Sequence, residues 1–134
     1  MRNTKRLDVL DKLVIAHGII TILFIIGHSS FWVLFDWKSE LLRLSPVNNQ
    51  VMQLLNIAVI CVLLLVAFCS FFRRSEILGS QLGRTLLIGW GLIMYVRAAS
   101  GLLIEDITIG SFIFAFFIAA YATLSFIPGL KARY

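Results

Sequence analysis

Four long apolar runs, separated by short polar segments, dominate the pattern of this chain. The runs cover residues 13–35, 51–72, 85–104 and 107–127. Each is close to the roughly 20 residues that a helix needs to cross the hydrocarbon core of a bilayer. The pattern predicts an all-α membrane protein with four transmembrane helices, and Pro128 followed by Gly129 is expected to end the last helix.

The connections between the runs are too short to hold a further domain. In residues 36–50 the segment SELLRL is expected to form one or two turns at the membrane interface. Residues 73–84 are basic, and only Glu105 and Asp106 separate the last two runs, which predicts a tight antiparallel hairpin. We therefore expect an up-down-up-down bundle that forms a single domain over residues 1–134.

The basic residues are distributed unequally between the two sides of this bundle. Four Lys and Arg precede the first run, three lie in the second connection and two in the C-terminal tail. The opposite side has only Lys38 and Arg43. Because Lys and Arg concentrate in short cytoplasmic loops, this split predicts a multi-pass protein of the bacterial inner membrane with both termini in the cytoplasm.

The amino-acid composition supports the membrane assignment and argues against nucleic-acid binding. The chain is 60% hydrophobic and 14% charged, whereas soluble domains are about 25% charged. The net charge of +5 arises from basic residues at the ends of the apolar runs, not from a basic stripe interleaved with aromatic residues. Nucleic acid is therefore not an expected partner.

Most polar side chains within the runs lie in the half of the bundle that faces outward in this topology. Arg97 is the costly member, because a charge at the bilayer centre is unfavourable by about 2.5–3.5 kcal/mol even on lenient scales. A structural partner, snorkelling to the outer headgroups or a ligand would each offset that cost. We predict a buried or ligand-binding cluster formed by His28, Trp32, Gln53, Asn56, Arg97, Glu105 and Ser111.

The fourth run has small residues on one helical face. This face permits close approach of a neighbouring helix, and it contains Ser111, Ala115, Ala119 and Ala122.

Haem is the one cofactor that the sequence raises as an alternative. His17 and His28 are both on the first helix and about 16 Å apart along it, so one chain cannot bridge a haem with them. A symmetric dimer, or Met94 as second ligand, would be needed. His17 itself is interpreted as an interfacial side chain. No HxxxH, HExxH or Cys-His cluster is present, so no metal site is expected, and no nucleophile motif indicates catalysis.

The function expected from these features is non-enzymatic. The chain is predicted to lie in the lipid bilayer and to bind a small polar or amphipathic ligand, or a partner membrane protein, through the outward cluster around Arg97 and His28. An accessory subunit of a membrane complex fits, because the chain has almost no mass outside the membrane. The alternatives are a homo-oligomeric channel or transporter with Arg97 in its pathway and a haem-binding electron-transfer subunit.

Overall fold

The structure is a computed structural model that describes residues 2–104 and 108–131, and every regular element in these ranges is a helix. Four helical segments are long and apolar enough to cross a membrane: Leu7–Ser29, Pro46–Phe72, Gln81–Leu103 and Ile109–Lys131. The all-helical fold with four candidate spans is therefore confirmed. The elements in chain order are α1 (Arg2–Ser29), α2 (Phe31–Leu34), α3 (Trp37–Glu40), η1 (Leu41–Arg43), α4 (Pro46–Phe72), α5 (Arg74–Gly79), α6 (Gln81–Ile104) and α7 (Ile109–Lys131).

The first long helix ends six residues earlier than its apolar pattern suggested. α1 stops at Ser29, and the apolar residues that follow form the separate short helix α2. The Ser30 hydroxyl donates to the Ile26 carbonyl at 2.7 Å, and such bonding to the preceding turn competes with regular helix geometry. The prediction of one continuous helix over residues 13–35 is wrong at this end.

The last long helix continues through its proline. α7 ends at Lys131 with Pro128 inside it, so the prediction that Pro128 and Gly129 stop the helix is wrong. Proline is tolerated in transmembrane helices when neighbouring groups compensate for its lost hydrogen bond. In α7 the proline removes the donor that would reach the Leu124 carbonyl. Separately, Arg84 Nε on α6 donates to the Gly129 carbonyl at 3.1 Å, which holds the end of α7 against α6.

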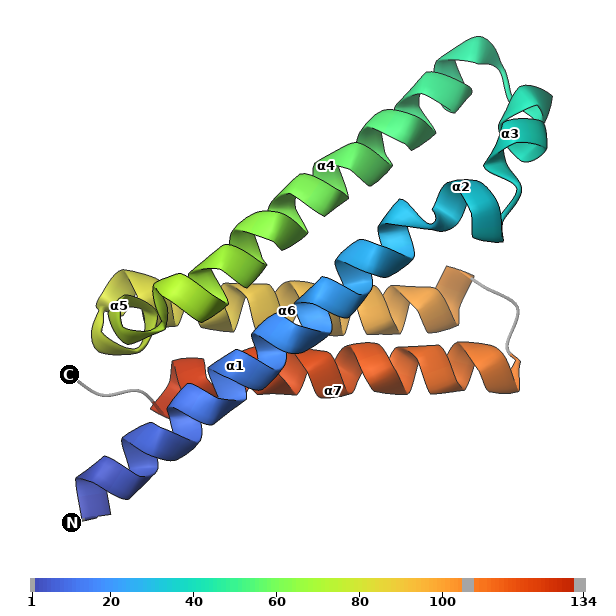
Figure 1. The fold of residues 1–134 in the computed structure, drawn as a ribbon. Helices are drawn as coiled ribbons and strands as arrows, with labels where there is room; N and C mark the ends of the chain where they lie inside the picture. The colour runs from blue at the N-terminus through green and yellow to red at the C-terminus, as the bar shows by residue number, and fades with distance from the viewer. Residues whose placement is uncertain (1, 105–107, 132–134) are drawn as a thin grey trace. The chain divides into compact units, whose positions relative to one another are not determined.

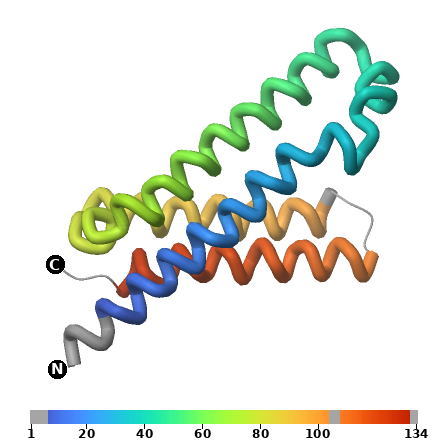
Figure 2. Tube along the Cα trace, in the orientation of Figure 1, coloured from blue at the N-terminus to red at the C-terminus, as the bar shows by residue number. Residues whose placement is uncertain are grey.

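The connection between α1 and α4 contains the turns that SELLRL predicted. α3 and η1 cover this segment, and Asp36 precedes them with a φ of 43°, in the left-handed region. Asn49 Nδ2, in the first turn of α4, donates to the Leu41 carbonyl at 3.0 Å. Figure 2 shows α2 and α3 as the short links that lead from α1 to α4.

The chain divides into two compact units. Unit 1 contains Met1–His17 and Cys69–Tyr134, and unit 2 contains Gly18–Phe68. The divisions fall inside α1 and α4 and not in a linker. Whether the chain behaves as a single domain stays a prediction.

Within unit 1, α6 and α7 lie side by side (Figure 1). The two helices are antiparallel. Ile88, early in α6, lies beside Gly129 near the end of α7, and Arg97, late in α6, lies beside Phe114 near the start of α7. A β-carbon on Gly91 would lie 2.9 Å from the β-carbon of Phe126. The two backbones therefore approach closely.

The small-residue face of α7 takes part in this packing. Ser111, Ala115 and Ala122 are buried, and Ala119 is half-buried. Burial of this face is confirmed, and at Ala122 it lies at the close contact with Gly91 of α6. Elsewhere in unit 1 a second apolar cluster joins α1, α5 and α6 through Leu10, Val14, Leu78 and Leu87.

Candidate functional site

Two members of the predicted polar cluster meet in unit 2. His28 Nδ1 donates to the Asn56 side-chain carbonyl at 2.8 Å, and the Asn56 amide nitrogen donates to the His28 backbone carbonyl at 3.1 Å. Asn56 is buried and His28 is half-buried. Because the two bonds run in opposite directions, they fix the depth and rotation of α1 relative to α4 within this unit. We call this pair the His28–Asn56 clamp.

The other two cluster members in unit 2 have different surroundings. Gln53 is hydrogen-bonded through its side-chain amide to Asn49, one turn earlier on the same helix. Trp32 is exposed and packs edge-on against Trp37, with ring centroids 5.7 Å apart. Trp32 on α2 and Trp37 on α3 therefore form an aromatic pair, and tryptophan is a residue type that concentrates at membrane–water interfaces.

Arg97 lies in unit 1, on α6, and its side chain is exposed. The guanidinium carbon is 5.6 Å from the centroid of the Phe114 ring on α7, within the range of a cation–π interaction. Glu105, another member of the predicted cluster, lies outside the described residues. Contact between Arg97 and the polar groups of unit 2 stays a prediction.

Ser111 has a structural role at the start of α7. Its hydroxyl accepts from the Thr108 backbone N–H at 2.8 Å, and the Ser111 N–H donates to the Thr108 hydroxyl at 3.1 Å. This reciprocal bonding satisfies N–H groups that a helix leaves without an internal partner. The structure thus gives Ser111 a capping function.

A second polar group, which the sequence reasoning missed, surrounds His17 in unit 1. The His17 side chain is 1% exposed, and this burial differs from the interfacial setting inferred from its position in the chain. Its Nδ1 shares a hydrogen bond with the Ser70 hydroxyl on α4 at 3.2 Å. Its ring stacks on Tyr121 of α7, with centroids 4.6 Å apart.

The group extends from Tyr121 to the remaining long helix. Trp90 Nε1 on α6 donates to the Tyr121 hydroxyl at 3.0 Å. Each of the four long helices therefore contributes one side chain, and we call His17, Ser70, Trp90 and Tyr121 the four-helix cluster. A signal for it existed in the sequence: if successive spans alternate in direction, these four residues all lie near the same end of their spans.

The four-helix cluster bears on the haem alternative. Nε2 of His17 is enclosed by protein atoms, and Nδ1 is engaged by Ser70. An iron atom bound at Nε2 would have to displace that packing. Met94, the other candidate ligand in unit 1, is half-buried on α6. The arrangement is that of a packed histidine that joins helices.

Comparison of the chain with models of known protein families, with curated proteins and with solved structures finds no match. The fold therefore defines the class of protein by itself. Four apolar helices of spanning length make this chain a helical, multi-pass membrane protein.

Proposed function

We propose that this chain is a non-enzymatic protein of the bacterial inner membrane that binds a partner membrane protein through the exposed face of α6 around Arg97. The observation that carries the proposal is the position of Arg97 on a membrane-spanning helix with its side chain exposed. Its ring contact, Phe114, is also exposed. A partner that covers both residues would remove an arginine from lipid.

A comparison of two free energies favours a further acceptor for the Arg97 guanidinium. An exposed cation–π contact contributes about 0.5–1 kcal/mol. A charge near the bilayer centre costs about 2.5–3.5 kcal/mol. The cost at the depth of Arg97 is smaller than this central value, and Phe114 offsets part of it. An acceptor for the guanidinium in a partner would offset the rest. A carboxylate in a transmembrane segment of the partner has the matching charge and planar geometry.

The surroundings of Arg97 fit a helix-binding surface better than a cavity for a soluble ligand. Ile93 and Val96 lie beside it on α6 with large exposed fractions, and Phe117 extends the apolar surface on α7. A single charge in an apolar face specifies register and orientation when two transmembrane helices associate. Only one alignment of the helices brings this charge next to the opposite charge on the partner.

The topology in this proposal follows from the unequal distribution of Lys and Arg. Nine basic residues on one side against Lys38 and Arg43 on the other support termini in the cytoplasm. Arg97 then lies in the outer half of the membrane, about 10 Å below the end of its helix by the rise of 1.5 Å per residue. Snorkelling of Arg97 to the outer headgroups is the competing explanation.

Photo-crosslinking in native membranes tests the proposal. A photoreactive phenylalanine analogue replaces Val96, which is 68% exposed beside Arg97, and in the control it replaces Leu65, which is 62% exposed on α4. We expect a discrete protein adduct from position 96 alone, and its partner should contain Asp or Glu within a transmembrane segment. Arg97→Leu should abolish the adduct, and Arg97→Lys should retain part of it.

The other outcomes are equally informative. Adducts with lipid only would assign Arg97 to snorkelling and overturn the proposal. An adduct with a second copy of the chain would favour the homo-oligomeric channel, and it would also overturn the proposal. Because the Arg97 side chain is exposed and its contact with Phe114 contributes at most about 1 kcal/mol, Arg97→Leu should leave the free energy of unfolding of the purified chain within about 1 kcal/mol of the parent.

A further inference from the structure

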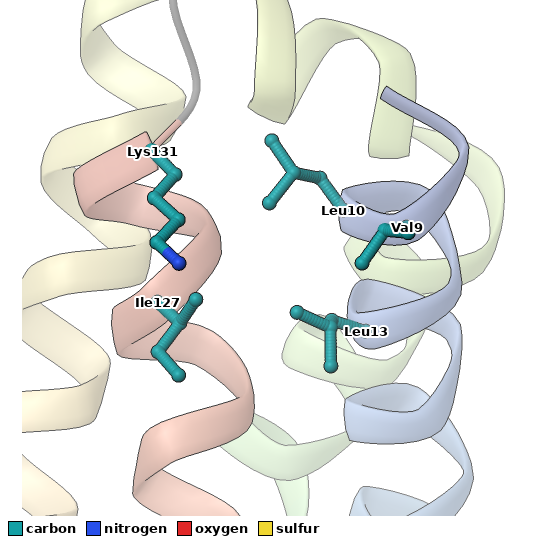
Figure 3. A pocket seen from close by; sticks show the side chains of 5 residues that line it. All are labelled: Val9, Leu10, Leu13, Ile127 and Lys131. Atoms are coloured by element: carbon teal, nitrogen blue, oxygen red, sulfur yellow. The ribbon is translucent and has the colours of Figure 1, made fainter. Parts of the chain in front are cut away.

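A groove lies between α1 and α7 in unit 1, apart from the surface around Arg97. Val9, Leu10 and Leu13 of α1 line one wall, and Ile127 and Lys131 of α7 line the other, around a volume of about 380 Å³. Figure 3 shows the side chains of the two helices facing one another across it. Leu10 is buried, while Val9 and Lys131 are exposed, so the groove opens to the surroundings.

The side chains that line the groove are complementary to a phospholipid. Four of the five lining side chains are aliphatic, and the fifth is an ammonium group. Val9 and Leu13 are one turn apart on α1, as are Ile127 and Lys131 on α7, so each wall is a ladder parallel to its helix. An acyl chain can lie along such ladders, and the ammonium of Lys131 can contact a phosphate.

The groove is also at the depth where a phospholipid changes from headgroup to tail. One wall begins near Leu7, where the first candidate span starts, and the other ends at Lys131, where the last span ends. In the topology of the proposed function, this end faces the cytoplasmic leaflet, which is rich in anionic lipid. Basic pockets between transmembrane helices on that side bind such headgroups.

The acidic residues near the groove are compensated by other cations. Asp8 forms an ion pair with Lys12 at 2.8 Å, and Asp11 forms one with Arg74 at 2.7 Å. Neither carboxylate therefore adds an uncompensated negative charge next to the groove. We propose that the groove between α1 and α7 binds an anionic phospholipid of the membrane, with an acyl chain along Val9, Leu13 and Ile127 and its phosphate at Lys131.

Native mass spectrometry of the full chain tests this proposal. The protein is released from nanodiscs that contain equal amounts of phosphatidylglycerol and phosphatidylcholine, and the retained lipid is counted. We expect one phosphatidylglycerol per chain in preference to phosphatidylcholine. Lys131→Gln should lower its retention about fivefold, the effect of one basic residue near a membrane surface. Lys38→Gln, which removes the same charge at an exposed position outside the groove, should not.

The apolar part of the groove has its own matched pair of variants. Val9→Trp should fill the groove and reduce retention of phosphatidylglycerol at least as much as Lys131→Gln. Ile19→Trp makes a similar change at a position of α1 with nearly equal exposure, 53% against 54%, and should have no effect. Both sites are exposed, so the fold should tolerate both changes, and circular dichroism with thermal unfolding checks this.

Three outcomes would overturn the proposal. Equal losses in Lys131→Gln and Lys38→Gln would mean that general surface charge retains the lipid. Unchanged retention in Val9→Trp would remove the groove from the explanation. Displacement of phosphatidylglycerol by inorganic phosphate alone would show a simple anion site without a role for the acyl chain. None of these outcomes depends on whether Arg97 binds a partner protein.

Discussion

The imidazole ring of His17 lies flat against the phenol ring of Tyr121, with centroids 4.6 Å apart and planes inclined by 6°. These residues are more than one hundred positions apart in the chain and join α1 to α7 within unit 1. The same tyrosine accepts a hydrogen bond from Trp90, and the same histidine is bonded to Ser70. One stacked pair thus couples the four long helices.

Tyr121→Phe should separate the two roles of this tyrosine. The variant retains the ring that stacks on His17 and removes the hydroxyl that accepts from Trp90 Nε1. A donor left without its acceptor away from water costs about 1–3 kcal/mol, and Trp90 is only half-buried, so we expect about 1 kcal/mol. The measurement is thermal or denaturant unfolding of the purified chain in detergent.

Tyr95→Phe is the matched control for that variant. Tyr95 is half-buried and its hydroxyl is 2.8 Å from that of Thr123, which also donates to the Ala119 carbonyl. Because Thr123 retains this second bond, Tyr95→Phe should cost less than about 0.5 kcal/mol. Equal losses of unfolding free energy in the two variants would mean that the four-helix cluster contributes no more to stability than the Tyr95–Thr123 pair.

Asn56→Ala should weaken unit 2 by removing both bonds of the His28–Asn56 clamp. It leaves the His28 carbonyl and Nδ1 without their partner, so we expect a loss of about 1–3 kcal/mol in unfolding free energy. Gln53→Ala is the control on the same helix, because the hydrogen bond from Gln53 to Asn49 lies within α4, and it should cost less than about 0.5 kcal/mol. A silent Asn56→Ala would show that the clamp does not hold the two helices together.

Gly91→Ala should destabilise the contact between α6 and α7. Its new β-carbon would lie 2.9 Å from the Phe126 β-carbon and 3.1 Å from the Ala122 carbonyl oxygen, so the helices must separate. Overpacking of this kind costs about 1–3 kcal/mol. Gly89→Ala meets no atom within 4 Å and should be neutral, or stabilising by up to about 1 kcal/mol through helix propensity. Equal effects of the two substitutions would contradict close packing at Gly91.

The proposed topology predicts opposite results from two reporter fusions. Alkaline phosphatase, which is active only outside the cytoplasm, should be active when inserted within residues 37–46. It should be inactive when fused after residue 134, and a fluorescent protein that matures in the cytoplasm should show the reverse. An external C-terminus would contradict the expected orientation and the partition of basic residues on which it depends.

The sequence by itself determined which parts of the chain are long helices. Apolar runs of this length must satisfy their backbone hydrogen bonds internally, and a helix does so from local sequence alone. The small face of α7 and the turns in SELLRL are equally local, and both were predicted. His28 and Asn56 were assigned to one polar cluster because the topology put them at a similar depth, and the structure joins them directly.

Tertiary structure decided which side chains meet and where two of the helices end. The periodicity of one helix gives its polar face, but the rotation and tilt of its neighbours determine what that face contacts. For this reason His17 could be placed in the chain but not against Tyr121, and Arg97 lies exposed beside Phe114. α7 continues past Pro128 to Lys131, and at this turn Gly129 packs against Leu87 and Ile88 of α6 while its carbonyl accepts from Arg84, a contact across 45 residues that no local signal contains.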